Sequence, residues 1–187
     1  MRILLALLIA LVLGPVAGGA LAEEIRITAA EVVPADDSLV LSANFEFEFT
    51  GRLEDALNQG IPLYFLIEFD LTRPRWYWFD EQIAHHTQKL RLWYHALTRQ
   101  YRLSSGTLHQ SYPSLDEAHR AISRLRNMVV AERVRMQPST EYWAALRMHL
   151  DTTELPKPFQ VSALANRDWT LASGWRRWRF NTLEPAQ

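Results

Sequence analysis

Hydrophobic and polar residues alternate with a period of two along most of this chain. The clearest case is segment 39–49, whose every second position is apolar, namely Leu39, Leu41, Ala43, Phe45, Phe47 and Phe49. Such alternation is typical of a β-strand with one buried face and one face in water. A shorter alternating segment, 25–29, precedes it, and residues 34–38 have the composition of a turn. We therefore expect a β-hairpin here.

Similar patterns predict strands around 63–71, 90–96, 101–103, 134–136 and 142–150, and short strands around 159–164 and 169–180. A short helix is expected between Thr50 and Gly60. The clearest helix begins after Pro113, where Ser114 and Glu117 have the spacing of a capping box. Its apolar stripe is Leu115, Ala118, Ile122, Leu125 and Val129. Residues 155–158 contain two prolines and are expected to form an extended loop.

These elements predict a mainly β fold. Many short strands with hairpin-like spacing favour an antiparallel β-sandwich or a partly open barrel, with one or two short helices over an end or edge. The strand–helix–strand order of a parallel sheet does not occur.

Residues 76–79, the run Trp-Tyr-Trp-Phe, allow two interpretations. In a strand, the run places aromatic rings on both faces, and these rings could form a stacking platform for a sugar or an apolar ligand. Dense aromatics more often belong to a core. We favour the second interpretation, a strand that is buried on both sides.

The first residues have the features of an export signal. Arg2 is followed by an unbroken apolar run, 3–13, and by small residues up to Ala22. This pattern is typical of a secretory signal peptide, residues 1–22, cleaved before Glu23. Residues 23–187 then form a single β-rich domain in the periplasm. The alternative is an uncleaved run that anchors the protein in the membrane.

The sequence contains no recognisable catalytic or metal motif, and we assign no catalytic residue, metal ligand or cofactor. The absence of cysteine excludes disulfides, thiol catalysis and thiolate metal sites. Adjacent His85 and His86 point to opposite faces of an extended segment, so they are unsuited to chelating one ion together. A hydrolase that uses histidines or carboxylates would require several of them to converge in a cleft.

The most unusual stretch is 173–180, Ser-Gly-Trp-Arg-Arg-Trp-Arg-Phe. Read as a strand, it places Trp178 and Phe180 on one face, for burial. Trp175, Arg177 and Arg179 share the other face and form a candidate partner-binding surface. The near-neutral net charge of −1 and the export signal argue against nucleic acid. An envelope protein or anionic lipid remains as the partner, and the oligomeric state stays open.

Two segments near the C-terminus resemble a known family. Residues 155–159, Leu-Pro-Lys-Pro-Phe, and 166–175 match the most recurrent part of a family of bacterial exported proteins without established function. Its members are often labelled proline-rich signal-peptide proteins. The run Trp169-Thr-Leu-Ala-Ser-Gly-Trp175 is its most distinctive motif. Lys157 stands where an apolar residue is common, and the signal peptide has one proline. Because members often lie beside a membrane sensor kinase, the resemblance implies an envelope role linked to signalling.

Three functional hypotheses follow. The first is an exported, non-enzymatic β-rich domain that binds a protein partner in the cell envelope, such as the sensor's extracytoplasmic part. The second is a module that holds a small or lipidic ligand between its sheets, in a cavity lined by aromatics such as Trp76, Trp78 or Trp93. The third is a hydrolase. The first predicts an exposed Arg177 and Arg179 and a buried Trp178 face.

Overall fold

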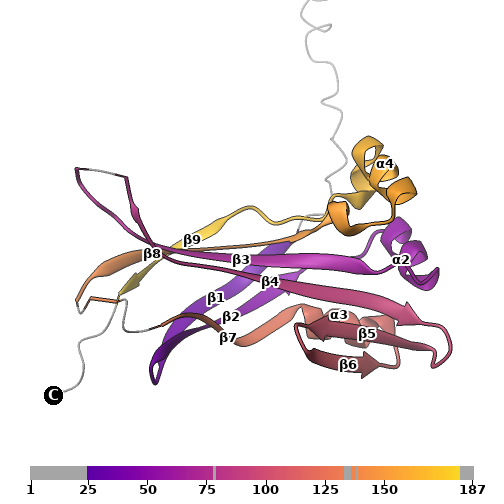
Figure 1. Ribbon diagram of the computed structural model, residues 1–187, viewed down its shortest axis with the longest axis horizontal. Coiled ribbons are helices and arrows are strands. Elements are labelled where there is room, and N and C mark those ends of the chain that lie inside the picture. Colours follow the sequence, from indigo (N-terminus) through magenta and orange to yellow (C-terminus); the bar gives the residue numbers. More distant parts are fainter. Residues whose placement is uncertain (1–24, 78, 133–135, 138, 182–187) are drawn as a thin grey trace, which may run out of the picture.

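The structure is a computed structural model and describes residues 25–77, 79–132, 136–137 and 139–181. Its strands form two antiparallel sheets that lie one above the other (Figure 1). The prediction of a mainly antiparallel β fold with few helices is confirmed. Of its two forms, the structure adopts the sandwich, because the sheets do not close into a barrel.

The larger sheet has six strands in the order β6-β5-β4-β3-β8-β9. Their bounds are β3 Leu63–Arg73, β4 Glu81–His95, β5 Gln100–Ser105, β6 Leu108–Tyr112, β8 Glu141–Leu150 and β9 Arg176–Asn181. Strand β3 is central. Its odd-numbered residues from Leu63 to Leu71 are buried and its even-numbered residues are half-buried, as the alternation predicts. The sheet therefore has an inner face toward the core and an outer face toward solvent.

The smaller sheet has the order β1-β2-β7, with β1 Arg26–Ala35, β2 Ser38–Glu46 and β7 Arg124–Glu132. Strands β1 and β2 form the predicted hairpin, with Ala35 paired to Ser38 across the turn. Asp36 adopts a positive φ of 46° in this turn, a conformation that aspartate tolerates better than most residues.

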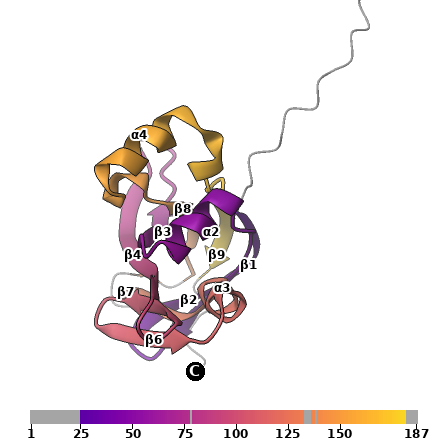
Figure 2. The ribbon, with the colours of Figure 1, turned by 90° about the vertical axis from the view of Figure 1, so that its right-hand side faces the viewer.

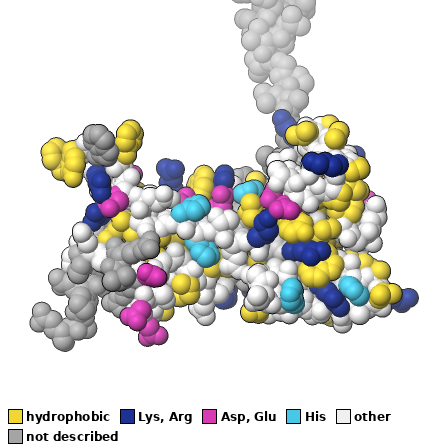
Figure 3. Space-filling model, viewed as in Figure 1, with side chains coloured by type: hydrophobic (Ala, Val, Ile, Leu, Met, Phe, Trp, Pro, Cys, Tyr) yellow, Lys and Arg dark blue, Asp and Glu magenta, His cyan; other side chains and the backbone are white. Residues whose placement is uncertain are grey.

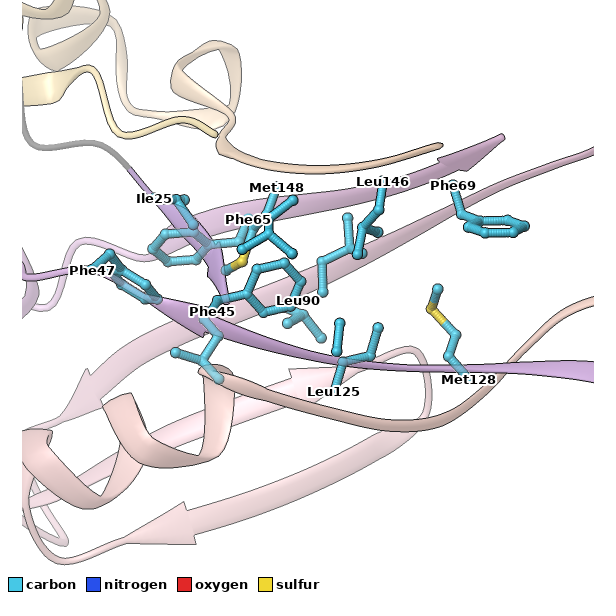
Figure 4. Packing of buried hydrophobic residues seen from close by; sticks show 14 of the residues in the cluster. Ile25, Phe45, Phe47, Phe65, Phe69, Leu90, Leu125, Met128, Leu146 and Met148 are labelled. Atoms are coloured by element: carbon cyan, nitrogen blue, oxygen red, sulfur yellow. The ribbon is translucent and has the colours of Figure 1, made fainter. Parts of the chain in front are cut away.

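The core lies between the two sheets (Figure 4). Phe65 of β3 and Met148 of β8 lie near Phe45 of β2, and farther along the interface Phe69 of β3 lies opposite Met128 of β7. All of these side chains are buried. Since burial of a large apolar side chain contributes about 1.5–3 kcal/mol, this contact between inner faces is what holds the sheets together.

Helices gather at one end of the sandwich (Figures 1 and 2). They are α2 Gly51–Asn58, α3 Leu115–Ile122 and α4 Lys157–Ala165, with two 3₁₀ turns, η2 Thr152–Glu154 and η3 Arg167–Trp169. The predicted caps are present, because Thr50 accepts a hydrogen bond from the amide of Leu53 and Ser114 from that of Glu117. Both helices begin where these caps satisfy free amide groups.

The predicted apolar stripe after Ser114 is not one helix. Helix α3 ends at Ile122, and Leu125 and Val129 lie in β7. Asn127, with φ of 50°, accompanies a register shift in the pairing of β7 with β2. Because of this bulge the buried Leu125 and Met128 are three positions apart, a spacing that imitates a helix. Val129 instead faces outward.

The strands predicted at 159–164 and 134–136 do not appear in the structure as expected. Residues 159–164 belong to helix α4, which begins at Lys157 inside the segment expected to be an extended loop. Proline at the start of a helix is well tolerated, because its missing amide would have no partner there. Met136 lies in no strand, and Val134 lies outside the described residues.

The interpretation of 76–79 as a buried strand is wrong. These residues belong to the loop between β3 and β4, which rises from the end of the sandwich opposite the helices (Figure 1). Trp76 is 94% exposed, Tyr77 64% and Phe79 84%. Trp78 lies outside the described residues. Pro74 cannot continue the strand ladder, so β3 ends before the aromatic run.

Candidate functional site

A hollow of about 590 Å³ lies on the outer face of the larger sheet. Its lining comes from strands β3, β4, β8 and β9 and from the residues directly before β4 and β9. It consists of Asp70, Thr72, Asp80, Gln82, Trp143, Ala145, Trp175 and Arg177. We call it the Ala145 hollow. The volume is within the range of small-ligand pockets and of pockets that receive an anchoring side chain.

The hollow exists because a small residue lies among large ones. Ala145 of β8 pairs with Asp70 of β3 on one side and Arg177 of β9 on the other. Strand spacing places these two chain positions about 10 Å apart, with Ala145 as the floor between them. Along β8, Trp143 lies two residues before Ala145 and therefore on the same face.

The aromatic walls are held by arginines. The guanidinium of Arg179 lies 5.3 Å from the ring centroid of Trp143, and that of Arg147 lies 4.8 Å from the ring of Trp175. A stacked cation of this kind contributes about 0.5–1 kcal/mol at an exposed site. Arg179 is also 3.7 Å from a carboxylate oxygen of Glu141. Both rings that line the hollow are thus stacked against an arginine.

Arg147 connects the hollow to an ionic cluster on β3. Its Nε donates to Oε2 of Glu68, and Nδ1 of His149 lies 3.4 Å from the same oxygen. The hydrogen bond from Arg147 lowers the pKa of Glu68 and raises that of Arg147. Burial lowers the pKa of His149, against the attraction of Glu68. At neutral pH, an ionised Glu68 therefore fixes the guanidinium on which Trp175 stacks.

Arg177 differs from the other arginines of this face. In the described part of the chain, no side chain or carbonyl forms a hydrogen bond or ion pair with its guanidinium, and the same is true of the Asp80 carboxylate. As far as the described residues go, Arg177 therefore keeps its donors available beside Trp175, which is 38% exposed. Arginine with free donors recognises carboxylate and phosphate groups well.

The three residues predicted from the sequence do share a face. Trp175 and Arg177 line the hollow, while Arg179 supports its far wall through Trp143. On the opposite side of β9, Phe180 is buried and Trp178 is half-buried, with its ring 6.4 Å from that of Phe69. Sequence reasoning missed Asp70, Trp143 and Ala145. The alternation of β3 and β8 assigns them to the outer face, but the pairing of distant strands brings them together.

A second arrangement on the same face involves His85 of β4. Its Nδ1 is 2.7 Å from Oδ1 of Asp70, and its Nε2 is 3.2 Å from the hydroxyl of Thr87. This hydroxyl–imidazole–carboxylate order resembles that of a nucleophilic triad. Half of the His85 side chain is exposed, so water screens these contacts. His86 pairs with Phe69 and points to the other side of the sheet, as predicted.

The two described tryptophans that the sequence suggested for a cavity between the sheets lie far from one another and outside the core. Trp76 lies in the β3–β4 loop, and Trp93 lies under the guanidinium of Arg91 at 4.5 Å on the outer face. Neither lines a space between the sheets. Among the residues that the structure describes, no group of three histidines and carboxylates is placed to hold a metal ion. In the same residues, no helix has the length and apolar character needed to span a membrane.

Fold and site together define a class: a two-sheet antiparallel β-sandwich with an open outer face of arginine-stacked tryptophans. The chain belongs to the family described as a domain of unknown function, DUF4390, whose model matches residues 22–179. No curated protein and no solved structure matches the chain.

Proposed function

We propose that this protein is an exported, non-enzymatic binding module of the cell envelope that recognises a protein partner through the Ala145 hollow. The observation that carries the proposal is Arg177, whose guanidinium has no hydrogen-bond or ion-pair partner among the described residues and lines the hollow together with Trp143 and Trp175. Tryptophan and arginine are the residue types that contribute most to protein interfaces.

The shape of this face supports a macromolecular partner. At one end of the sheet the β3–β4 loop rises, and at the other lie α4 and η2, with Glu154 of η2 2.5 Å from Lys89 of β4. The outer face between them is low and open (Figures 1 and 3). A partner segment lying in this trough can place a large side chain over Ala145 and a carboxylate on Arg177.

The proposed compartment rests on the first residues. The apolar run 3–13 and the small residues that follow support export, and they lie outside the described residues. The resemblance to exported proteins labelled proline-rich signal-peptide proteins is consistent with this. The extracytoplasmic part of a membrane sensor kinase is the partner that this resemblance favours.

A hydrolase is the second candidate, because Thr87, His85 and Asp70 have the order of a triad. We place the hydrolase second because catalytic triads work where water is excluded, whereas half of the His85 side chain is exposed here. Its test is the hydrolysis of simple esters by the wild type and by T87A and D70N. Activity that disappears in both variants would put the enzyme first.

The main test is affinity capture from envelope extract with three variants. A145L fills the hollow, and R177E reverses the charge beside it. R99E is the control, because Arg99 is exposed in the turn between β4 and β5, away from the hollow. We expect a stoichiometric protein captured by the wild type and R99E and reduced at least about tenfold with A145L and R177E. Equal capture by all four proteins would overturn the proposal.

A further inference from the structure

The β3–β4 loop ends in a cluster of exposed aromatic side chains, Trp76, Tyr77 and Phe79, which we call the aromatic tip. The rings of Trp76 and Tyr77 contact each other edge to face, with centroids 5.1 Å apart. The other strongly exposed apolar residues, such as Leu97, Leu108 and Leu164, belong to separate elements. In the space-filling view, the hydrophobic extremity of the loop projects from one end of the molecule (Figure 3).

The stem of the loop is braced. Arg73 pairs with Glu81 across the hairpin, and Nη2 of Arg75 lies 2.7 Å from Oε2 of the same carboxylate. These contacts lower the pKa of Glu81, Arg75 contributing most. The loop therefore holds its aromatic end away from the sheet, although burial of those rings in the core would be favourable.

The chemistry of the tip matches a membrane interface. Tryptophan and tyrosine have an apolar body and a polar end, and they are enriched where lipid headgroups meet hydrocarbon. The stem has two arginines and two acids, Asp80 and Glu81, so segment 73–81 carries no net charge. A tip that projects needs a deep complementary pocket in a protein, whereas a fluid bilayer accommodates it without one.

We infer that the aromatic tip inserts into the interfacial region of a lipid bilayer and seats the sandwich on the membrane surface. Asp80 and Gln82 follow the tip directly in the chain and line the Ala145 hollow. Seated in this way, the hollow lies next to the headgroup layer. The inference does not depend on the proposed partner, because vesicles without protein suffice to test it.

The absence of cysteine from the chain permits a local test. Y77C, labelled with an environment-sensitive fluorophore, reports on the tip. L97C is the matched control, because Leu97 is 93% exposed in the β4–β5 turn. The full chain is mixed with protein-free vesicles of phosphatidylethanolamine, with and without phosphatidylglycerol. A local probe separates the tip from any insertion of residues 3–13.

We expect a blue shift of the Y77C probe, quenching by lipids with a headgroup nitroxide, and neither change at L97C. Adding W76S and F79S to Y77C should weaken the apparent partition by at least about fivefold. Because segment 73–81 is neutral, raising salt from about 0.1 to 1 M should change the partition little. A Y77C probe that responds only to envelope proteins, or only to a higher concentration of the chain itself, would overturn the inference.

Discussion

Two regions of this molecule have similar composition but form different structures. Residues 173–180 and residues 73–79 both combine arginines with large aromatics. The first leads into β9, which begins at Arg176, and in which Phe180 is buried while Arg177 and Arg179 face solvent. The second leads into a loop in which the described aromatic residues, Trp76, Tyr77 and Phe79, are exposed. The difference lies in the order of residues. In β9, alternation turns Trp178 and Phe180 toward the core side and Arg177 and Arg179 toward solvent, whereas the consecutive aromatics that follow Pro74 have no such alternation.

The largest expected difference between the two regions is in stability. F180A removes a buried ring, and we expect it to lower the free energy of unfolding by about 3 kcal/mol or more. F79A removes the same ring where it is 84% exposed, and should change stability by less than about 0.5 kcal/mol. Urea denaturation followed by circular dichroism measures both.

Equal costs for F180A and F79A would contradict this account, because β9 would then not close the core. A denaturant slope that differs between the variants would point instead to a change in the surface exposed on unfolding.

The fold is predictable from the sequence where hydrophobic and polar residues alternate regularly. Segments 63–71 and 142–150 show uninterrupted alternation, and each forms the expected strand with the expected inner face. Segment 39–49 does so as far as Glu46, and residues 47–49 continue outside the strand. Prediction fails where a local irregularity changes the period. The bulge at Asn127 makes the start of β7 resemble a helix, and the prolines at 156 and 158 conceal the start of α4.

The site was predictable in part for a different reason. The pattern of β9 identifies its outward face, which carries Arg177 and Arg179, and Trp175 lies on the same side just before the strand. The Ala145 hollow depends on strand order, since Asp70, Ala145 and Arg177 lie on three strands far apart in sequence. Propensity and alternation contain no information about which strands are neighbours in a sheet of mixed connections.

A smaller effect on stability is expected beside β9, and it depends on pH. Arg147 holds the pKa of Glu68 below its ordinary value of about 4.5, so the stabilisation from this pair is present above that pH and is lost as pH falls through the lowered pKa. We expect E68Q to cost about 1 kcal/mol at neutral pH, and we expect the difference from wild type to shrink as pH falls through the lowered pKa of Glu68. Urea denaturation at a series of pH values measures it.

Burial lowers the pKa of His149 as well, so wild-type stability should already decline as pH falls below about 6.5. E48Q is the control for E68Q, because Glu48 is exposed beyond the end of β2. A pH profile of E68Q that parallels the wild type down to pH 3 would show that the Arg147 pair does not support the β9 side of the hollow.

The outer face of β9 offers a finer comparison between two neighbouring arginines. Arg179 lies against Trp143 and near Glu141, whereas Arg177 has no partner among the described residues. R179A should cost about 0.5–1 kcal/mol, and R177A should be neutral within about 0.5 kcal/mol. Thermal unfolding resolves the two. A larger cost for R177A would mean that its guanidinium has a structural role and is less available to a partner.

The smallest effect is expected at the stem of the aromatic tip, where it appears in local dynamics rather than in stability. E81Q removes the carboxylate that holds Arg73 and Arg75. Trypsin cuts after arginine, and the bond after Arg75 is the relevant one because Pro74 protects the bond after Arg73. We expect E81Q to be cut after Arg75 about three times faster than wild type, because local opening becomes easier.

Cleavage after Arg99, in the turn at the far end of β4, serves as the internal reference and should be unchanged in E81Q. Mass spectrometry of the fragments distinguishes the two sites. An unchanged rate after Arg75 would mean that the ion pairs do not brace the stem. The exposure of Trp76 and Phe79 would then follow from Pro74 and the aromatic run alone, and the tip would reach a membrane as a mobile loop rather than as a held one.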